Sequence, residues 1–86
     1  MFIVFGKETC PYCINTKTLL DESRKKYIYL PLEEEQNSDY VDKLISLKLI
    51  PEIHTTVPKV IKFKKKKGKS IFIGGYEDLL DYFERK

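Results

Sequence analysis

Short hydrophobic segments along the chain alternate with longer segments in which apolar residues recur every three or four positions. We interpret the short segments as strands because they are continuously apolar or rich in aromatic and β-branched residues. They are residues 2–5, 27–32, 57–63 and 70–73. The longer segments have the periodicity of amphipathic helices. They cover residues 11 to about 25, residues from 37 or 38 to a point before Pro51, and residues from 76 onward.

Local signals support these helix boundaries. Pro11 suits the first position of a helix, where its missing N–H would have no partner. Asn37 or Ser38 is expected to cap the second helix, because such side chains accept hydrogen bonds from the first free N–H groups. The third helix follows the break at Gly74-Gly75 and carries acidic residues in its first turn, which is favourable for the helix dipole.

The order of these elements is strand, helix, strand, helix, strand, strand, helix, or βαβαββα. The first three elements predict two parallel strands joined by a right-handed crossover. The last two strands flank Gly68 and predict an antiparallel hairpin. We therefore expect an α/β fold, with a four-stranded mixed sheet flanked by helices on both faces and a single domain over residues 1–86.

Composition excludes some classes of protein but does not identify a function. Hydrophobic residues make up 42% of the chain and charged residues 34%, which is typical of a folded globular protein. The net charge of +3 is mild and does not indicate a nucleic-acid partner. The apolar start ends at Lys7 and Glu8, too early for a signal peptide, and no apolar run has transmembrane length. We expect a cytoplasmic protein with no membrane partner.

The chemistry concentrates at Cys10 and Cys13, the only cysteines. A disulfide that closes so small a loop stabilises a fold little, so the pair indicates redox chemistry. Cys10 stands where the first strand gives way to a helix, whose free N–H groups favour a thiolate, and Lys7 adds a positive charge. Cys13 lies one turn further on, should be more shielded and should have the higher pKa. Cys10 is therefore the expected nucleophile and Cys13 the resolving thiol.

Two other interpretations of the cysteine pair are weaker. Buried cysteines that only pack have no reason to stand at a strand-to-helix junction, which is the context of the redox motif. A structural zinc site needs four ligands, and the chain offers only Cys10, Cys13 and His54. We therefore expect no metal.

Three segments resemble the motifs of glutaredoxins. Residues 7–13, Lys-Glu-Thr-Cys-Pro-Tyr-Cys, resemble the active-site segment of the dithiol members. Thr56-Val57-Pro58 resembles the family's Thr-Val-Pro motif, and residues 74–79 resemble its Gly-Gly-x-Asp-Asp-Leu segment. The resemblance runs over residues 2–83. It implies a thioredoxin-like fold and a glutathione-dependent thiol–disulfide oxidoreductase that reduces protein–glutathione mixed disulfides and protein disulfides.

The resemblance also implies how glutathione, the reducing co-substrate, binds. Val57 would present its backbone to the cysteinyl part of glutathione, and the family's proline is cis. The N–H groups of Tyr76 and Glu77 would receive the γ-glutamyl carboxylate, and Asp78 would pair with the ammonium group. The implied contacts are Lys7, Tyr12, Thr56, Val57, Pro58, Gly75, Tyr76, Glu77 and Asp78.

Partners follow from the same resemblance. Glutathionylated or disulfide-bonded proteins, with ribonucleotide reductase among them by family analogy, would be substrates of a monomer. The sequence departs from the family in two places. Thr55-Thr56 replaces a basic residue common before the Thr-Val-Pro motif, and residues 48–54 form a longer segment than usual.

Three alternatives belong to other functional classes. A thioredoxin would carry Trp-Cys-Gly-Pro-Cys, but the chain has no tryptophan. An iron–sulfur carrier that shares a cluster across a dimer usually lacks the equivalent of Pro11 or the second cysteine. An adaptor would instead act through a basic hairpin, although a solvated hairpin is the simpler interpretation. The lysines around Gly68 are Lys62, Lys64, Lys65, Lys66, Lys67 and Lys69.

Overall fold

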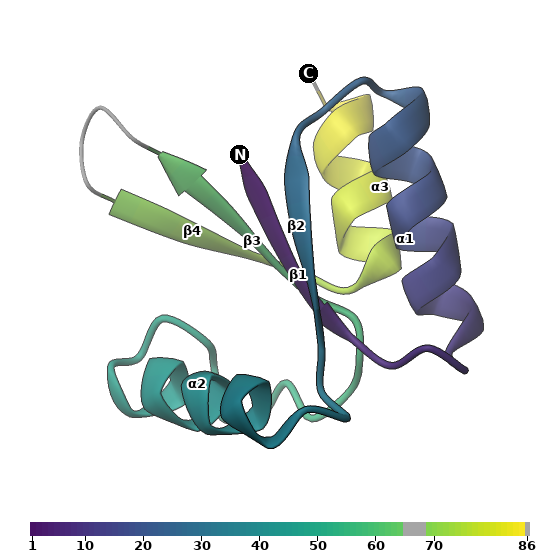
Figure 1. Cartoon of the computed structure of the whole chain (residues 1–86). Coiled ribbons are helices and arrows are strands. Elements are labelled where there is room, and N and C mark those ends of the chain that lie inside the picture. The colour runs from purple at the N-terminus through teal and green to yellow at the C-terminus, as the bar shows by residue number, and fades with distance from the viewer. Residues whose placement is uncertain (65–68, 86) are drawn as a thin grey trace.

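The computed structural model describes residues 1–64 and 69–85 and contains a four-stranded sheet with helices on both faces (Figure 1). The tip of the predicted lysine hairpin, residues 65–68, lies outside the described residues. The elements are β1 Phe2–Gly6, α1 Pro11–Glu22, β2 Tyr27–Pro31, α2 Glu35–Ser46, β3 Lys59–Lys64, β4 Lys69–Gly74 and α3 Tyr76–Glu84. Their order confirms the predicted βαβαββα pattern. Among the described residues, no helix is both long and apolar enough to cross a membrane.

The strands run in the order β2-β1-β3-β4, with β1 parallel to β2 and antiparallel to β3. The parallel pair and the β3–β4 hairpin are both as predicted. Helices α1 and α3 lie side by side on one face of the sheet, and α2 lies on the other (Figure 1). The end of β1 therefore lies beside the start of β3, where Phe5 pairs with Lys59.

Each face of the sheet has its own hydrophobic core, because successive residues of a strand point to opposite faces. Phe2 and Val4 of β1 face α1 and α3 and form one cluster with Leu20, Val60 and Leu79. Phe5, the next residue of the strand, faces α2 and belongs to the second cluster. The remaining buried members of that second cluster are Val41, Leu44, Ile50 and Ile61.

The first helix is three residues shorter than predicted, because the chain turns at a residue in the left-handed conformation. Arg24 has φ 55°, its N–H donates to Asp21 O at 3.1 Å, and the Lys25 N–H donates to Leu20 O at 3.0 Å. This pair of hydrogen bonds is a Schellman motif, which usually has glycine at the left-handed position. The same motif ends α2 at Lys48, whose φ is 62°.

Two other boundaries also differ from the prediction. Helix α2 begins at Glu35 after Glu34, so neither Asn37 nor Ser38 caps it. The Asn37 side chain is buried instead and donates to Pro31 O at 2.9 Å, which ties the helix to the end of β2. Strand β3 begins at Lys59 rather than at residue 57, because Pro58 has no N–H to donate to the β1 ladder.

Replacing Lys48 by glycine is expected to stabilise the protein. The left-handed backbone costs a non-glycine residue energy, so Lys48→Gly should raise the free energy of unfolding by about 0.5–1 kcal/mol after the entropy cost of glycine. Urea unfolding followed by circular dichroism measures this difference. Lys43→Gly, an exposed position inside α2, is the matched control and should lower stability by about 1 kcal/mol. Destabilisation by both substitutions would contradict this account.

Candidate active site

Cys10 occupies the N-cap of α1, as predicted. Its backbone is extended, with φ −88° and ψ 116°, and Pro11 begins the helix. The Cys10 carbonyl oxygen accepts hydrogen bonds from the N–H groups of Cys13 and Ile14, both at 3.1 Å. The Cys10 side chain is half-buried, and its thiol is free. The sulfur therefore sits at the positive end of the helix, where approach from solvent remains open.

Cys13 lies one turn further along α1 and is 0% exposed. The Lys7 N–H donates to the Cys13 Sγ at 3.4 Å. Burial, more than the nearby Cys10 and Glu33, raises the pKa of the Cys13 thiol to about 11. The expectation that Cys13 is the more shielded of the two cysteines is confirmed.

Gly6, the last residue of β1, makes room for the buried sulfur. A methyl group added at Gly6 would lie 2.7 Å from the Cys13 Sγ and 2.9 Å from the Tyr29 Oη. Both distances are closer than a real Cβ tolerates, so only glycine lets α1 pack this closely against the end of the strand. Sequence reasoning missed both Gly6 and Tyr29, because nothing in the sequence marks them as neighbours of Cys13.

The Thr-Val-Pro segment approaches Cys10 from the other side of the site. The Val57-Pro58 peptide bond is cis, as the family resemblance implied. The Cys10 thiol lies 3.9 Å from the Val57 carbonyl oxygen, toward which it donates a long hydrogen bond. Two residues that are 47 positions apart in the sequence thus meet at the reactive sulfur.

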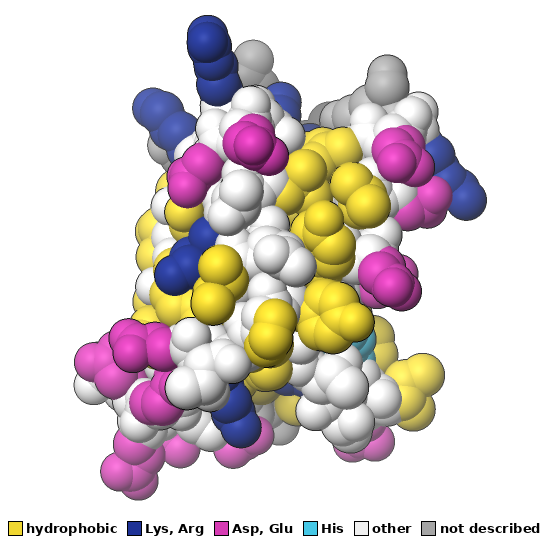
Figure 2. All heavy atoms as spheres, turned by 90° about the vertical axis from the view of Figure 1, so that its right-hand side faces the viewer, with side chains coloured by type: hydrophobic (Ala, Val, Ile, Leu, Met, Phe, Trp, Pro, Cys, Tyr) yellow, Lys and Arg dark blue, Asp and Glu magenta, His cyan; other side chains and the backbone are white. Residues whose placement is uncertain are grey.

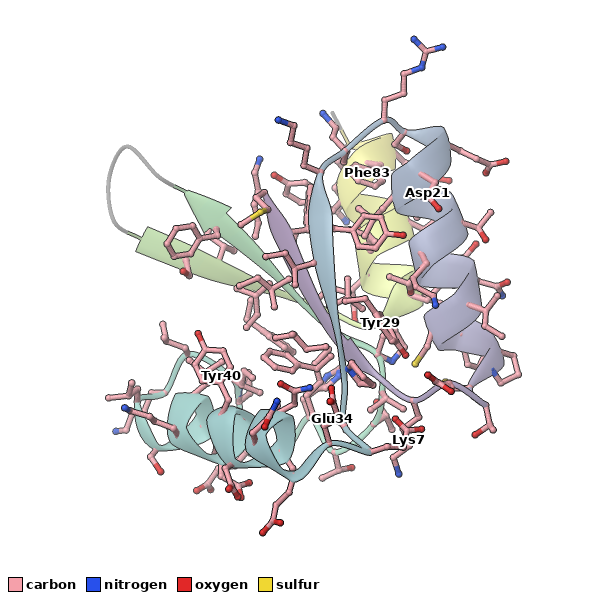
Figure 3. All side chains as sticks on the ribbon, viewed as in Figure 1. Lys7, Asp21, Tyr29, Glu34, Tyr40 and Phe83 are labelled. Atoms are coloured by element: carbon pink, nitrogen blue, oxygen red, sulfur yellow. The ribbon has the colours of Figure 1, made fainter. Side chains whose placement is uncertain are left out.

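A cavity of about 360 Å³ opens beside this contact, within the size range of small-molecule sites. Its walls come from the start of α1, the Thr-Val-Pro segment and the start of α3. They comprise Tyr12, Thr56, Val57, Pro58, Gly75, Tyr76, Glu77 and Asp78. These are all of the predicted glutathione contacts except Lys7, which is exposed on the loop between β1 and α1 (Figure 3). Three segments of sequence thus contribute to one site.

The start of α3 forms the far wall of this cavity. The Asp78 carboxylate accepts a hydrogen bond from the Gly75 N–H at 3.0 Å, which fastens the turn into the helix. The N–H groups of Tyr76 and Glu77 belong to the first helical turn and have no acceptor within the helix. Gly74 has φ 120°, a conformation that glycine adopts readily, and it permits this sharp entry.

The loop before Val57 is held by two residues whose role the sequence analysis missed. Lys59 is only 6% exposed, and its ammonium group donates to the carbonyl oxygen of His54. The His54 ring packs edge-on against Phe72 at 4.9 Å, with its Nε2 3.4 Å from Pro58 O. In the sequence, the only sign of this role is that Lys59 stands at the start of an otherwise largely apolar strand. Within the described residues, no three metal-ligating side chains gather around His54 or elsewhere.

The surface around the site is partly apolar. Tyr12 is 56% exposed and Ile14 49%, and the ring of Tyr12 lies 6.3 Å from that of Tyr76. Figure 2 shows hydrophobic side chains running down the face formed by α1 and α3, with acidic side chains around its lower edge. A larger cavity of about 390 Å³ lies at the opposite end of β1 and α1, lined in part by Lys25, Lys26 and Lys62. It contains neither cysteine and none of the motif residues.

Solved structures define the class of fold. Glutaredoxin 1 from Francisella tularensis, complexed with cacodylate, is 20% identical with a TM-score of 0.70, covering 99% of this chain and 96% of that one. A buckwheat glutaredoxin–glutathione complex is 26% identical with a TM-score of 0.71, covering 98% and 68%. A dithiolic glutaredoxin from Trypanosoma brucei brucei is 26% identical with a TM-score of 0.70, covering 98% and 77%. The predicted thioredoxin-like fold is therefore confirmed.

The family follows from the sequence match. A search of curated proteins found no significant relative. The glutaredoxin family model, however, matches residues 2–65, about three quarters of the chain. The chain therefore belongs to the glutaredoxin family and is a thiol–disulfide oxidoreductase, with Cys10 and Cys13 as its Cys-x-x-Cys pair.

Gly6→Ala should destabilise the protein, because its methyl group must displace the Cys13 sulfur or the Tyr29 hydroxyl. We expect the free energy of unfolding to fall by about 1–3 kcal/mol, the usual cost of overpacking a core. Urea unfolding of the reduced protein measures this loss. Gly75→Ala is the control, since its added methyl group would meet nothing closer than 3.7 Å. A loss as large in the control would show that contact with Cys13 is not the cause.

In the Cys10→Ser variant, Cys13 should remain a thiol well above neutral pH. The substitution removes the smaller influence of Cys10 but leaves the burial that chiefly raises the pKa of Cys13. Because a raised thiol pKa favours the protonated form, thiolate should appear only as the pH passes above 9.0, the ordinary value. Ultraviolet thiolate absorbance against pH tests this. Full thiolate absorbance at pH 8 would contradict it.

Proposed function

We propose that this protein reduces protein–glutathione mixed disulfides and protein disulfides, with glutathione as its electron donor. The main support is the convergence of eight motif residues on one cavity beside Cys10. The buckwheat relative, solved as a complex with glutathione, shares this fold. An NADPH-dependent reductase would reduce glutathione disulfide back to glutathione.

Cys10 supplies the nucleophile in this proposal. Its thiolate attacks the glutathione sulfur of a mixed disulfide, so a Cys10–glutathione bond forms while the substrate protein leaves as a thiolate and takes up a proton. A second glutathione thiolate then attacks the glutathione bound to Cys10. Glutathione disulfide leaves, and the Cys10 thiolate is restored.

Cys13 is needed when the substrate is a protein disulfide. Attack by Cys10 releases the first substrate thiol and leaves a disulfide between Cys10 and the substrate. Cys13 then attacks the Cys10 sulfur and releases the second substrate thiol. The resulting Cys10–Cys13 disulfide is reduced by two glutathione molecules. The difference in exposure supports this division of roles, since Cys10 is half-buried and Cys13 is fully buried.

Glutathione would span the cavity between Cys10 and α3. The backbone of Val57 pairs with its cysteinyl residue in the manner of an added strand, which also brings the glutathione sulfur to Cys10. The N–H groups of Tyr76 and Glu77 receive the γ-glutamyl carboxylate. Asp78 uses one oxygen to hold Gly75, which leaves the other for the ligand's ammonium group. The remaining contacts, at the glycyl end, are Lys7 and Tyr12.

Reduction of a small glutathione mixed disulfide, coupled to NADPH and glutathione reductase, tests the proposal. We expect Cys10→Ser to abolish activity, because it removes the attacking sulfur, and Cys13→Ser to keep most of it. The wild-type disulfide should be reduced by glutathione and not by thioredoxin reductase. A folded wild-type protein with two free thiols and no activity would overturn the proposed function.

Several expectations from the sequence remain predictions. They are the cytoplasmic location, the monomeric state, the absence of a resident metal and the choice of ribonucleotide reductase as a substrate. The role of the lysine hairpin is of the same kind, because its tip lies outside the described residues.

A further inference from the structure

Tyr29 carries a buried hydroxyl group that has no hydrogen-bond partner within residues 1–64 and 69–85. Its side chain projects from β2 into the layer between the sheet and α1 (Figure 3). Burying a hydroxyl group without a partner costs free energy, so its presence calls for a physical reason. A phenylalanine at this position would fill nearly the same space without that cost.

The hydroxyl group lies close to the resolving sulfur. A single point, the position of a methyl group on Gly6, is 2.9 Å from the Tyr29 Oη and 2.7 Å from the Cys13 Sγ. The oxygen and the sulfur are therefore at most 5.6 Å apart, the sum of these two distances. A hydrogen bond between them requires that the two atoms approach each other across the space beside Gly6.

The surroundings keep Tyr29 in place and protonated. The ammonium group of Lys17, one helical turn beyond Cys13, lies 4.3 Å from the centre of the Tyr29 ring. Burial raises the pKa of Tyr29 to about 12, and nearby Cys13, Glu33, Cys10 and Glu8 add to the rise. At neutral pH the Tyr29 hydroxyl is therefore a proton donor.

We propose that Tyr29 is a positioning residue for the second half of the dithiol cycle: its hydroxyl group donates a hydrogen bond to the Cys13 sulfur as that sulfur becomes a thiolate. The inference rests on the proposed function, in which Cys13 resolves a disulfide formed at Cys10. It adds a residue outside the three motifs to the machinery of that step.

The resolving step balances without a further reactant. Cys13 gives up its proton, which ends on the departing partner sulfur, and the Cys13 thiolate attacks the Cys10 Sγ of the mixed disulfide. The Cys10–Cys13 bond forms, and the bond from Cys10 to the partner sulfur breaks. The partner leaves with the electron pair, takes up a proton and is reduced, while the cysteine pair is oxidised. Tyr29 keeps its own proton throughout.

The Tyr29 hydroxyl group interacts more strongly with a Cys13 thiolate than with the Cys13 thiol. A neutral thiol is a weak acceptor, and in the dithiol form the Lys7 N–H already donates to the Cys13 sulfur at 3.4 Å. A thiolate accepts stronger, charge-assisted hydrogen bonds, and a buried thiolate needs them because water does not reach it. An interaction gained only as the charge develops lowers the barrier without stabilising the resting thiol.

The test follows the reaction of reduced protein with glutathione disulfide. Acid-quenched samples analysed by mass spectrometry separate two steps: formation of the Cys10–glutathione mixed disulfide, and its conversion to the Cys10–Cys13 disulfide. Tyr29→Phe should leave the first step unchanged and slow the second about tenfold, as expected for one hydrogen bond to a charged acceptor. Between pH 7 and 9, the curve of second-step rate against pH should shift by about one unit toward higher pH.

The control is Tyr27→Phe, two residues earlier on the same strand and packed against the same core, with its hydroxyl beside Asp21 at the other end of α1. It should leave both steps unchanged. Thermal unfolding should show that Tyr29→Phe is no less stable than the wild type, since the hydroxyl group has no partner to lose.

The outcomes separate this inference from the proposed function. Equal rates of the second step in Tyr29→Phe and wild type, or an equal slowing of both steps, would overturn the role of Tyr29 alone. A wild-type protein that forms no mixed disulfide with glutathione would overturn the proposed function itself.

Discussion

The contact between the Cys13 sulfur and the backbone of Gly6 is the constraint on which the active site depends. It lets the first turn of α1 pack directly onto the end of β1, because no side chain separates helix from strand. The same contact buries Cys13 completely and raises its pKa, while Cys10, at the N-cap, stays half-buried at the positive end of the helix. One close approach thus makes two chemically identical residues unequal.

Sheet topology then brings the rest of the site to that point. The end of β1 lies beside the start of β3, so the Thr-Val-Pro segment that enters β3 must pass next to Cys10. Strand β4 returns antiparallel to β3, and Gly74 at its end pairs with Val60 near the start of β3. Helix α3 therefore starts at the same end of the sheet as the Thr-Val-Pro segment. The cavity is therefore a consequence of strand order, with its walls supplied by segments that enter or leave the sheet. Buried Lys59 and the His54 ring hold the entering loop.

Much of this arrangement was predictable because it is encoded locally. Strand and helix periodicities are read over a few residues, and Pro11 marked the start of α1 correctly. Local rules failed where a side chain or backbone group had a distant partner. Asn37 looked like a cap, but it fastens α2 to β2. Arg24 and Lys48 adopt the left-handed conformation without being glycine, so the sequence carried no sign that the helices end there.

The sequence by itself determined the class of chemistry, since a Cys-x-x-Cys pair at a helix start and two distant motifs specify a redox site and the backbone groups around it. Only the tertiary structure decided which side chains surround the second sulfur. Gly6 of β1 and Tyr29 of β2 lie beside Cys13, and Lys17, in the next turn of α1, packs over the Tyr29 ring. No sequence spacing relates a residue on β2 to a residue on α1, because their contact depends on how the helix packs against the sheet.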